Sequence, residues 1–185
     1  MKKLLLASFC FGFIFTSCTT EEKTDPFSIT KTNIGLLTKE VQVKQLDSIF
    51  ANDSIVKKSR NQGFSAGSEI YVYDNKGKEL LLLDPVQSFD STSTIANIEI
   101  KDPRFKTLKG LNSESTFKDI NENYKISRIE NTLKTAVIFI DEINAYVTID
   151  KESISGTARY NTDVKIEPSQ IPDDAKIKHF WIGWK

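Results

Sequence analysis

The chain has 185 residues, with 25 Lys and Arg against 25 Asp and Glu, one histidine and two cysteines. No stretch is strongly basic with interleaved aromatic residues, which argues against nucleic acid as a partner. The lone histidine and the scarcity of thiols argue against a zinc or haem centre, so we expect no metal and no other cofactor. The length predicts a single domain.

The N-terminus has the pattern of a signal peptide. Two lysines precede an apolar run from residue 4 to residue 15. This run is too short for a membrane-spanning helix, which needs about 20 apolar residues, but it suits a secretory signal. Two small residues then lead into Cys18, and this resembles a lipobox, although Phe15 replaces the usual Leu. We predict that residues 1–17 are a signal peptide and that Cys18 carries the lipid.

The lipid on Cys18, with palmitate among its acyl chains, would anchor the protein in the bacterial outer membrane, on either its periplasmic or its outer face. Residues 18–27 are mostly polar and contain a proline, which predicts a flexible tether. Cys10 falls in the signal peptide and Cys18 is modified. No thiol therefore remains for a disulfide in the globular domain, which we place at 28–185.

The first half of this domain reads as a short helix followed by strands. Apolar residues recur at helical spacing over 38–50, with Thr38 as a candidate N-cap. Strands are predicted from residue 55, on both sides of a hairpin signal at 74–78, and over 94–100.

The second half repeats this order. Ser115 and Thr116 are candidate N-caps for a second helix that reaches residue 124. Runs rich in branched residues over 136–140 and 145–149 flank a second hairpin signal, and a last strand is predicted near the C-terminus.

The two halves align at a shift of about 75 residues, which brings Gly35 onto Gly110. We therefore predict an α+β fold with two tandem helix-plus-antiparallel-strand units, 32–102 and 108–185, that share one β-sheet.

Three segments, 32–40, 46–50 and 115–120, resemble uncharacterised lipoproteins of flavobacteria, and this likeness extends over most of the mature chain. Segment 115–120 together with Tyr124 is also similar, more faintly, to the RpoE-regulated lipoproteins of enterobacteria. Neither family has an assigned activity, so these resemblances imply an envelope lipoprotein without naming its function.

A third resemblance is one of layout. Gly35 and Thr38 form a Gly-x-x-Thr pattern before a helix, and Gly110 begins the second unit with Ser113 in the Thr position. This arrangement is similar to that of the β-lactamase inhibitory protein. It implies a binding surface on a sheet, with no catalysis.

The last strand contains the candidate interaction residues. Strand alternation places Phe180, Ile182 and Trp184 on one face, which we expect to face the core. His179 and Trp181 then lie on the opposite face. An exposed Trp is a common anchor at protein interfaces, so we predict these two residues as a contact site.

The sequence contains no catalytic constellation. A serine nucleophile would need a base and a Gly-x-Ser-x-Gly elbow, and no such elbow occurs. We therefore predict no catalytic residue. The favoured function is a membrane-anchored envelope lipoprotein that acts as a binding or assembly module for a protein partner. The alternatives are a hydrolase that uses two carboxylates and a carrier of a small apolar ligand.

Overall fold

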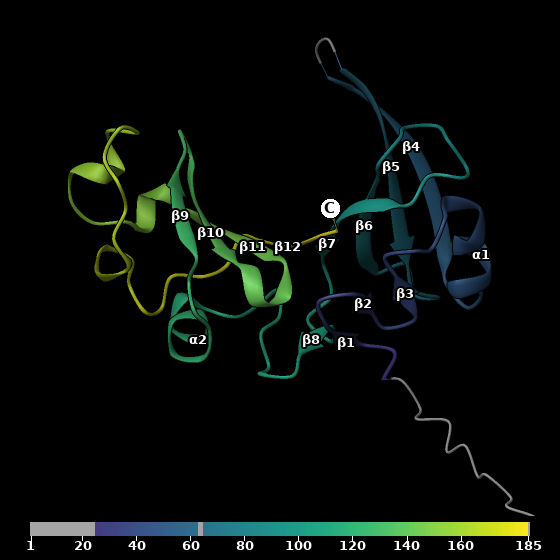
Figure 1. Ribbon diagram of the computed structural model, residues 1–185, viewed down its shortest axis with the longest axis horizontal. Coiled ribbons are helices and arrows are strands. Elements are labelled where there is room, and N and C mark those ends of the chain that lie inside the picture. Colours follow the sequence, from purple (N-terminus) through teal and green to yellow (C-terminus); the bar gives the residue numbers. More distant parts are fainter. Residues whose placement is uncertain (1–24, 63–64, 185) are drawn as a thin grey trace, which may run out of the picture.

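The computed structural model describes residues 25–62 and 65–184, so the predicted signal peptide and Cys18 lie outside the described residues. The described chain forms two β-sheets and two short helices (Figure 1). The helices are α1 (Leu46–Ile49) and α2 (Phe117–Asn123), and a 3-10 turn, Val43–Gln45, precedes α1. Further 3-10 turns are Asp141–Ile143, Lys151–Ser153, Thr157–Arg159 and Pro168–Gln170.

The small sheet has four two-residue strands: β1 (Ser28–Ile29), β2 (Asn33–Ile34), β3 (Leu37–Thr38) and β8 (Lys106–Thr107). The large sheet has eight strands: β4 (Ser54–Gln62), β5 (Ser65–Tyr73), β6 (Glu79–Pro85), β7 (Ile95–Ile100), β9 (Arg128–Asn131), β10 (Thr135–Ile140), β11 (Ala145–Asp150) and β12 (His179–Gly183).

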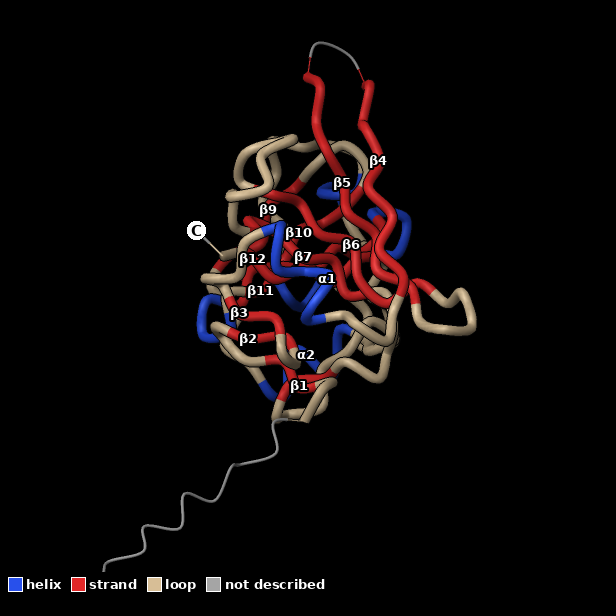
Figure 2. The backbone as a smooth tube through the Cα atoms, turned by 90° about the vertical axis from the view of Figure 1, so that its right-hand side faces the viewer, coloured by secondary structure: helices blue, strands red, loops and turns tan. Residues whose placement is uncertain are grey.

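The large sheet is antiparallel throughout, in the order β4-β5-β6-β7-β12-β11-β10-β9. The last strand of the chain, β12, is therefore inserted at the centre, between β7 and β11. In Figure 1 strands β4–β6 and β9–β11 lie on opposite sides of the molecule, with β7 and β12 between them. The turned view in Figure 2 shows the long β4–β5 hairpin projecting from one end.

The prediction of an α+β fold built from two tandem helix-plus-strand units is wrong, because the protein is mainly β. Helix α1 has four residues and α2 has seven, too few to be stable without tertiary packing. Thr38, expected as an N-cap, lies in β3. The N–H groups of Val43 and Lys44 bind the carbonyls of Ser93 and Ser91, both at 2.9 Å, and this contact with the loop before β7 replaces the expected first helical turns.

One core lies between the large sheet and the elements that cover it. Ile29, Ile34 and Leu37 of the small sheet belong to the same buried cluster as Phe117 of α2 and Phe180 of β12. In the part of the chain that the structure describes, helices and small sheet pack against this core face. The reverse face of the large sheet, called here the open face, carries the candidate site.

Candidate functional site on the open face of the large sheet

A row of side chains crosses the open face at one level of the sheet. Arg128 of β9 pairs with Phe139 of β10, Phe139 with Tyr146 of β11, and Tyr146 with Trp181 of β12. Trp181 in turn pairs with Glu99 of β7. We call these five residues the open-face row. Strand register alone brings them together, because residues directly opposite one another share a face.

The aromatic rings of the row stack on one another. The centroids of Tyr146 and Trp181 lie 6.0 Å apart with parallel planes, and those of Phe139 and Tyr146 lie 5.8 Å apart. The guanidinium carbon of Arg128 lies 3.5 Å from the ring centroid of Phe139, in a cation–π contact. These contacts make Phe139, Tyr146 and Trp181 one continuous aromatic strip across strands β10, β11 and β12.

Glu99, the β7 member of the row, carries a buried charge, and Leu82 of β6 is its next cross-strand neighbour. Glu99 is only 4% exposed. One carboxylate oxygen lies 2.5 Å from Nδ1 of His179 and the other lies 2.7 Å from Nζ of Lys101. A buried carboxylate requires such partners, because removing one of them leaves an uncompensated charge. His179 is thus committed to Glu99, and its side chain remains 41% exposed.

A shallow hollow of about 560 Å³ lies beside the row. Gly183 lines the floor of this hollow. A Cβ added at Gly183 would lie 3.5 Å from Oδ1 of Asn97 and 3.8 Å from Cε1 of Tyr146. Asn97 and Asn144 also line it, and Nδ2 of Asn144 donates to the carbonyl of Lys31 at 3.4 Å. Amides beside aromatic edges can bind the backbone and side chains of a polypeptide.

Tyr146 stays a neutral phenol in this setting. Burial, together with the carboxylates of Asp84 and Glu99, raises the pKa of Tyr146 to about 12. Its hydroxyl lies 3.4 Å from Oδ1 of Asn97. The hydroxyl can therefore act as a hydrogen-bond donor across the physiological pH range.

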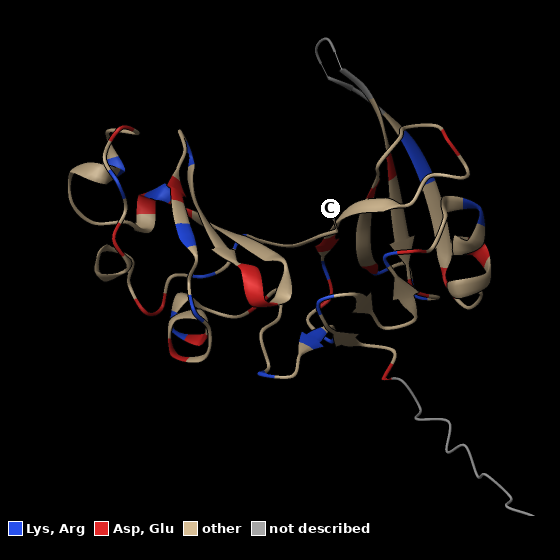
Figure 3. Cartoon of the chain, viewed as in Figure 1, with Lys and Arg blue, Asp and Glu red and all other residues tan. Residues whose placement is uncertain are grey.

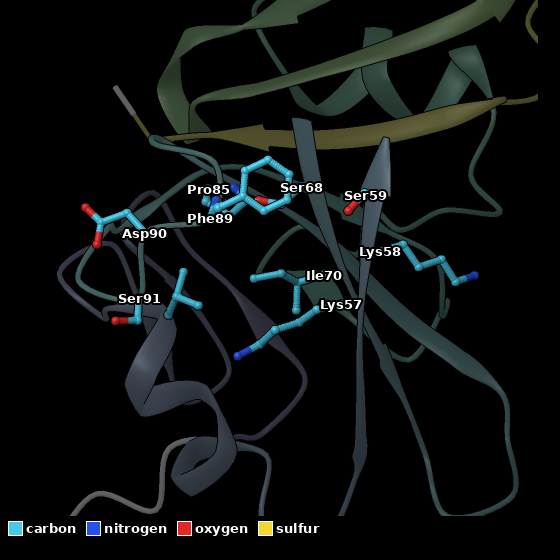
Figure 4. A pocket seen from close by; sticks show the side chains of 10 residues that line it. Lys57, Lys58, Ser59, Ser68, Ile70, Pro85, Phe89, Asp90 and Ser91 are labelled. Carbon is cyan, nitrogen blue, oxygen red and sulfur yellow. The ribbon is translucent and has the colours of Figure 1, made fainter. Parts of the chain in front are cut away.

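A second hollow lies between β4, β5 and the loop before β7 (Figure 4). Its volume is about 230 Å³, below the roughly 300–1,000 Å³ typical of ligand pockets. Phe89 at its edge is 67% exposed and has a φ of 64°, an uncommon backbone conformation. The Phe89 N–H donates to Oγ of Ser68 at 3.2 Å, which fixes this loop on β5. This hollow is therefore small for the alternative function, a carrier of a small apolar ligand.

Two carboxylates meet in a third hollow of about 190 Å³, which Asp53, Asp74 and Arg104 line. Burial and the charge of Asp74 raise the pKa of Asp53. Backbone hydrogen bonds, first that of Lys78, lower the pKa of Asp74. The two acids thus differ, as a general acid and a base must. However, Asp74 caps the β5–β6 turn by accepting the N–H groups of Lys76 and Lys78, both at 2.9 Å. The role of the Asp74 carboxylate is therefore to stabilise this turn.

Charges of both signs are interspersed along the described chain (Figure 3). Among the described residues no group of three or more His, Cys, Asp or Glu is placed to hold a metal ion. No helix in residues 25–62 or 65–184 is long and apolar enough to cross a membrane.

The structure places both predicted contact residues on the open face, where Trp181 and His179 are partly buried. Phe180 and Ile182 are fully buried and Trp184 is 6% exposed, as strand alternation indicated. The other members of the row were not predicted from the sequence. Alternation within β10 and β11 could have assigned Phe139 and Tyr146 to one face each, but only the strand order shows that these faces coincide with that of Trp181.

Comparison with known proteins places the chain by its fold alone. No family model matches the sequence, and none of the curated proteins matches it. The two-sheet architecture is similar to the crystal structure of the uncharacterised protein YfeY from Escherichia coli, with a TM-score of 0.58. The two sequences are 11% identical, and the match covers 85% of this chain and 99% of that chain. One enterobacterial protein thus shares the fold, while membership of the enterobacterial or the flavobacterial lipoprotein family stays a prediction.

Proposed function

We propose that the protein is a lipid-anchored envelope module that binds a protein partner on the open face of its large sheet. The single observation that carries this proposal is the open-face row, in which Phe139, Tyr146 and Trp181 are all only partly buried. Large aromatic side chains at the centre of a sheet face, with Arg128 at the end of the row, have the composition of an interface hot spot.

The composition of the site favours a polypeptide as the ligand. Tyr, Trp and Arg are the residue types enriched at protein–protein interfaces, and Arg128 lies against Phe139 at one end of the aromatic strip. The aromatic strip and the amides of Asn97 and Asn144 suit side chains and peptide groups of a partner.

Photo-crosslinking in the protein's own cells tests this proposal. A photoreactive amino acid at position 146 should yield a discrete adduct with one envelope protein. The same substitution at Tyr160, which is 83% exposed in a loop outside the large sheet, is the matched control and should yield none. Equal adducts at both positions would contradict the proposal, as would saturable binding of a purified saccharide that quenches Trp181.

A second variant separates contact from folding. Gly183→Val places a branched side chain on the floor of the hollow, where the modest Cβ distances of 3.5 Å and 3.8 Å allow it without a backbone change. We expect the adduct at position 146 to disappear while the thermal midpoint stays near that of the parent protein. Persistence of the adduct would show that the partner does not use this hollow.

The anchor is tested independently. Its support is the short apolar run followed by Thr16, Ser17 and Cys18. Cells fed a labelled fatty acid should label the parent protein and should not label Cys18→Ala, which should leave the outer membrane fraction. Label retained on Cys18→Ala would overturn the lipid assignment.

A further inference from the structure

We infer that the turn carrying Leu108 docks on the surface of the membrane that anchors the protein, an inference that rests on the proposed lipid at Cys18. Leu108 is 96% exposed, a more extreme exposure than that of any other large apolar residue among the described ones. It lies in the turn that follows β8, at the end of the small sheet. A leucine at the tip of a turn, with its side chain almost wholly in water, can enter the headgroup region of a bilayer without any rearrangement of the domain.

The turn presents Leu108 firmly. The Gly110 N–H donates to the carbonyl of Thr107 at 2.9 Å, and Gly110 has the φ of +84° that such a turn requires. Thr107 is buried, and its hydroxyl bonds that of Tyr124. Nζ of Lys109 donates to the carbonyl of Asn123 at 2.7 Å. With both of its flanks fixed, the turn holds Leu108 at its tip, where its side chain lies in water.

The turn lies beside the point where the described chain begins. Strand β1 pairs with β8, which sets Ser28 opposite Lys106. The N–H of Lys106 also donates to the carbonyl of Phe27 at 3.0 Å. Both views show β1 at the end of the molecule where the described chain starts (Figures 1 and 2).

The tether is short, which limits the distance between this end and the bilayer. Six residues, 19–24, separate Cys18 from Asp25. Even fully extended, these residues span only about 20–25 Å, at roughly 3.3–3.6 Å per residue. A tethered site also has a high effective concentration near the membrane, so a contact too weak to hold a free protein suffices here.

The charge beside the turn points to an anionic phospholipid surface as the occupant. Lys109 is paired with Glu142 at 2.8 Å, whereas Lys106, next to the turn, is exposed and makes no ion pair among the described residues. A leucine that inserts between headgroups, with a lysine beside it that meets their phosphates, is the pattern of an interfacial contact. The small sheet lies on the core side of the large sheet. Docking through it therefore leaves the open-face row on the reverse side, accessible to a partner.

A thiol-attached, environment-sensitive fluorophore tests the docking in the mature lipidated protein. It is placed by Leu108→Cys, and the control is Leu133→Cys. Leu133 is 86% exposed in the turn between β9 and β10, at the opposite end of the molecule from the start of the described chain (Figure 1). With Cys10 removed and Cys18 acylated, the introduced thiol is the only reactive one in the mature sequence.

The proteins are reconstituted in vesicles of phosphatidylethanolamine and phosphatidylglycerol. We expect the fluorophore at 108 to shift its emission to shorter wavelength and to be quenched by lipids with a nitroxide near the headgroup, and the fluorophore at 133 to behave as in water. Adding Lys106→Gln should reduce the shift. Equal signals at 108 and 133 in protein that floats with the vesicles would overturn the docking alone. Failure of the protein to float would overturn the anchor and the docking with it.

Discussion

The two faces of strand β12 differ in what they do for the molecule. Phe180 and Ile182 point into the core and are completely buried, whereas Trp181 and His179, their immediate neighbours, lie partly exposed on the open face. The open face carries Trp181 beside Tyr146, whereas on the core face the cross-strand neighbours of Phe180 are the aliphatic Val147 and Ile100. One strand thus places large apolar side chains in the core on one side and leaves others accessible on the other, where we propose that they contact a partner.

The largest loss of stability should follow from truncating Phe180, on the core face of β12. Phe180→Ala removes a fully buried ring from the centre of the large sheet and leaves a cavity, which should lower the free energy of unfolding by about 3–5 kcal/mol. Denaturant titration measures this loss. A loss below about 1 kcal/mol would mean that the sheet is not packed as described.

The second-largest loss of stability should follow from a substitution of Asp102, a charged residue at the border of the core. The side chain of Asp102 is fully buried. Burial alone would raise its pKa, but hydrogen bonds from the side chain and backbone of Arg104 and from Lys78 lower the pKa of Asp102 to about 2. Because the folded value is depressed, this stabilisation is complete above the unfolded pKa near 4 and is lost as pH falls toward 2.

Asp102→Asn should therefore cost about 2 kcal/mol at neutral pH. The measurement is unfolding free energy against pH. The parent protein should lose stability between about pH 4 and pH 2, and the variant should show a flatter curve over that window. Parallel curves for the two proteins would contradict the assignment.

The variant Trp181→Ala tests the open face of β12 against its core face. Because the ring is only partly buried, we expect a loss of about 1–2 kcal/mol, below the range for a buried aromatic residue. The crosslinked adduct at position 146 should be lost. If Trp181→Ala destabilises the domain as much as Phe180→Ala, Trp181 belongs to the core, and the proposed contact site loses its anchor.

The sequence predicted much of this contrast within single strands. Alternation in β12 assigned Phe180 and Trp181 to opposite faces, and the hairpin signal at 74–78 lies where the β5–β6 turn occurs. Strand alternation and turn signals depend only on residues that are close together in the sequence. The assembly of the row was not predictable, because it requires the insertion of β12 between β7 and β11. The contact of Glu99 with His179 joins residues that no local pattern connects.

The fold class was missed for a related reason. Strands β1 and β8 have two residues each and form only because segments almost 80 residues apart come together, as at Ser28 and Lys106. No alternation can be detected over two residues. The helical pattern around residues 38–50 was real over Leu46–Ile49, but bonds to the loop before β7 shortened the helix.

A smaller effect is expected at the start of α2. Oδ2 of Asp119 accepts the backbone N–H of Thr116 at 2.7 Å, which is half of a capping box. Asp119→Ala should lower the free energy of unfolding by about 0.5–1 kcal/mol. Glu122→Ala, one turn later on the same helix, is a suitable control and should change it less. Equal losses from the two variants would show that the cap is not formed.

The smallest effect should come from Leu108. Its side chain is almost entirely in water, so Leu108→Ser removes no packing and should change the free energy of unfolding by less than about 0.5 kcal/mol. The measurement is a denaturant titration of the protein in the absence of vesicles, compared with Leu133→Ser. A loss of 1 kcal/mol or more at Leu108 alone would show that the turn packs against the domain. In that case its side chain could not also serve as the membrane contact, because one apolar surface cannot be buried twice.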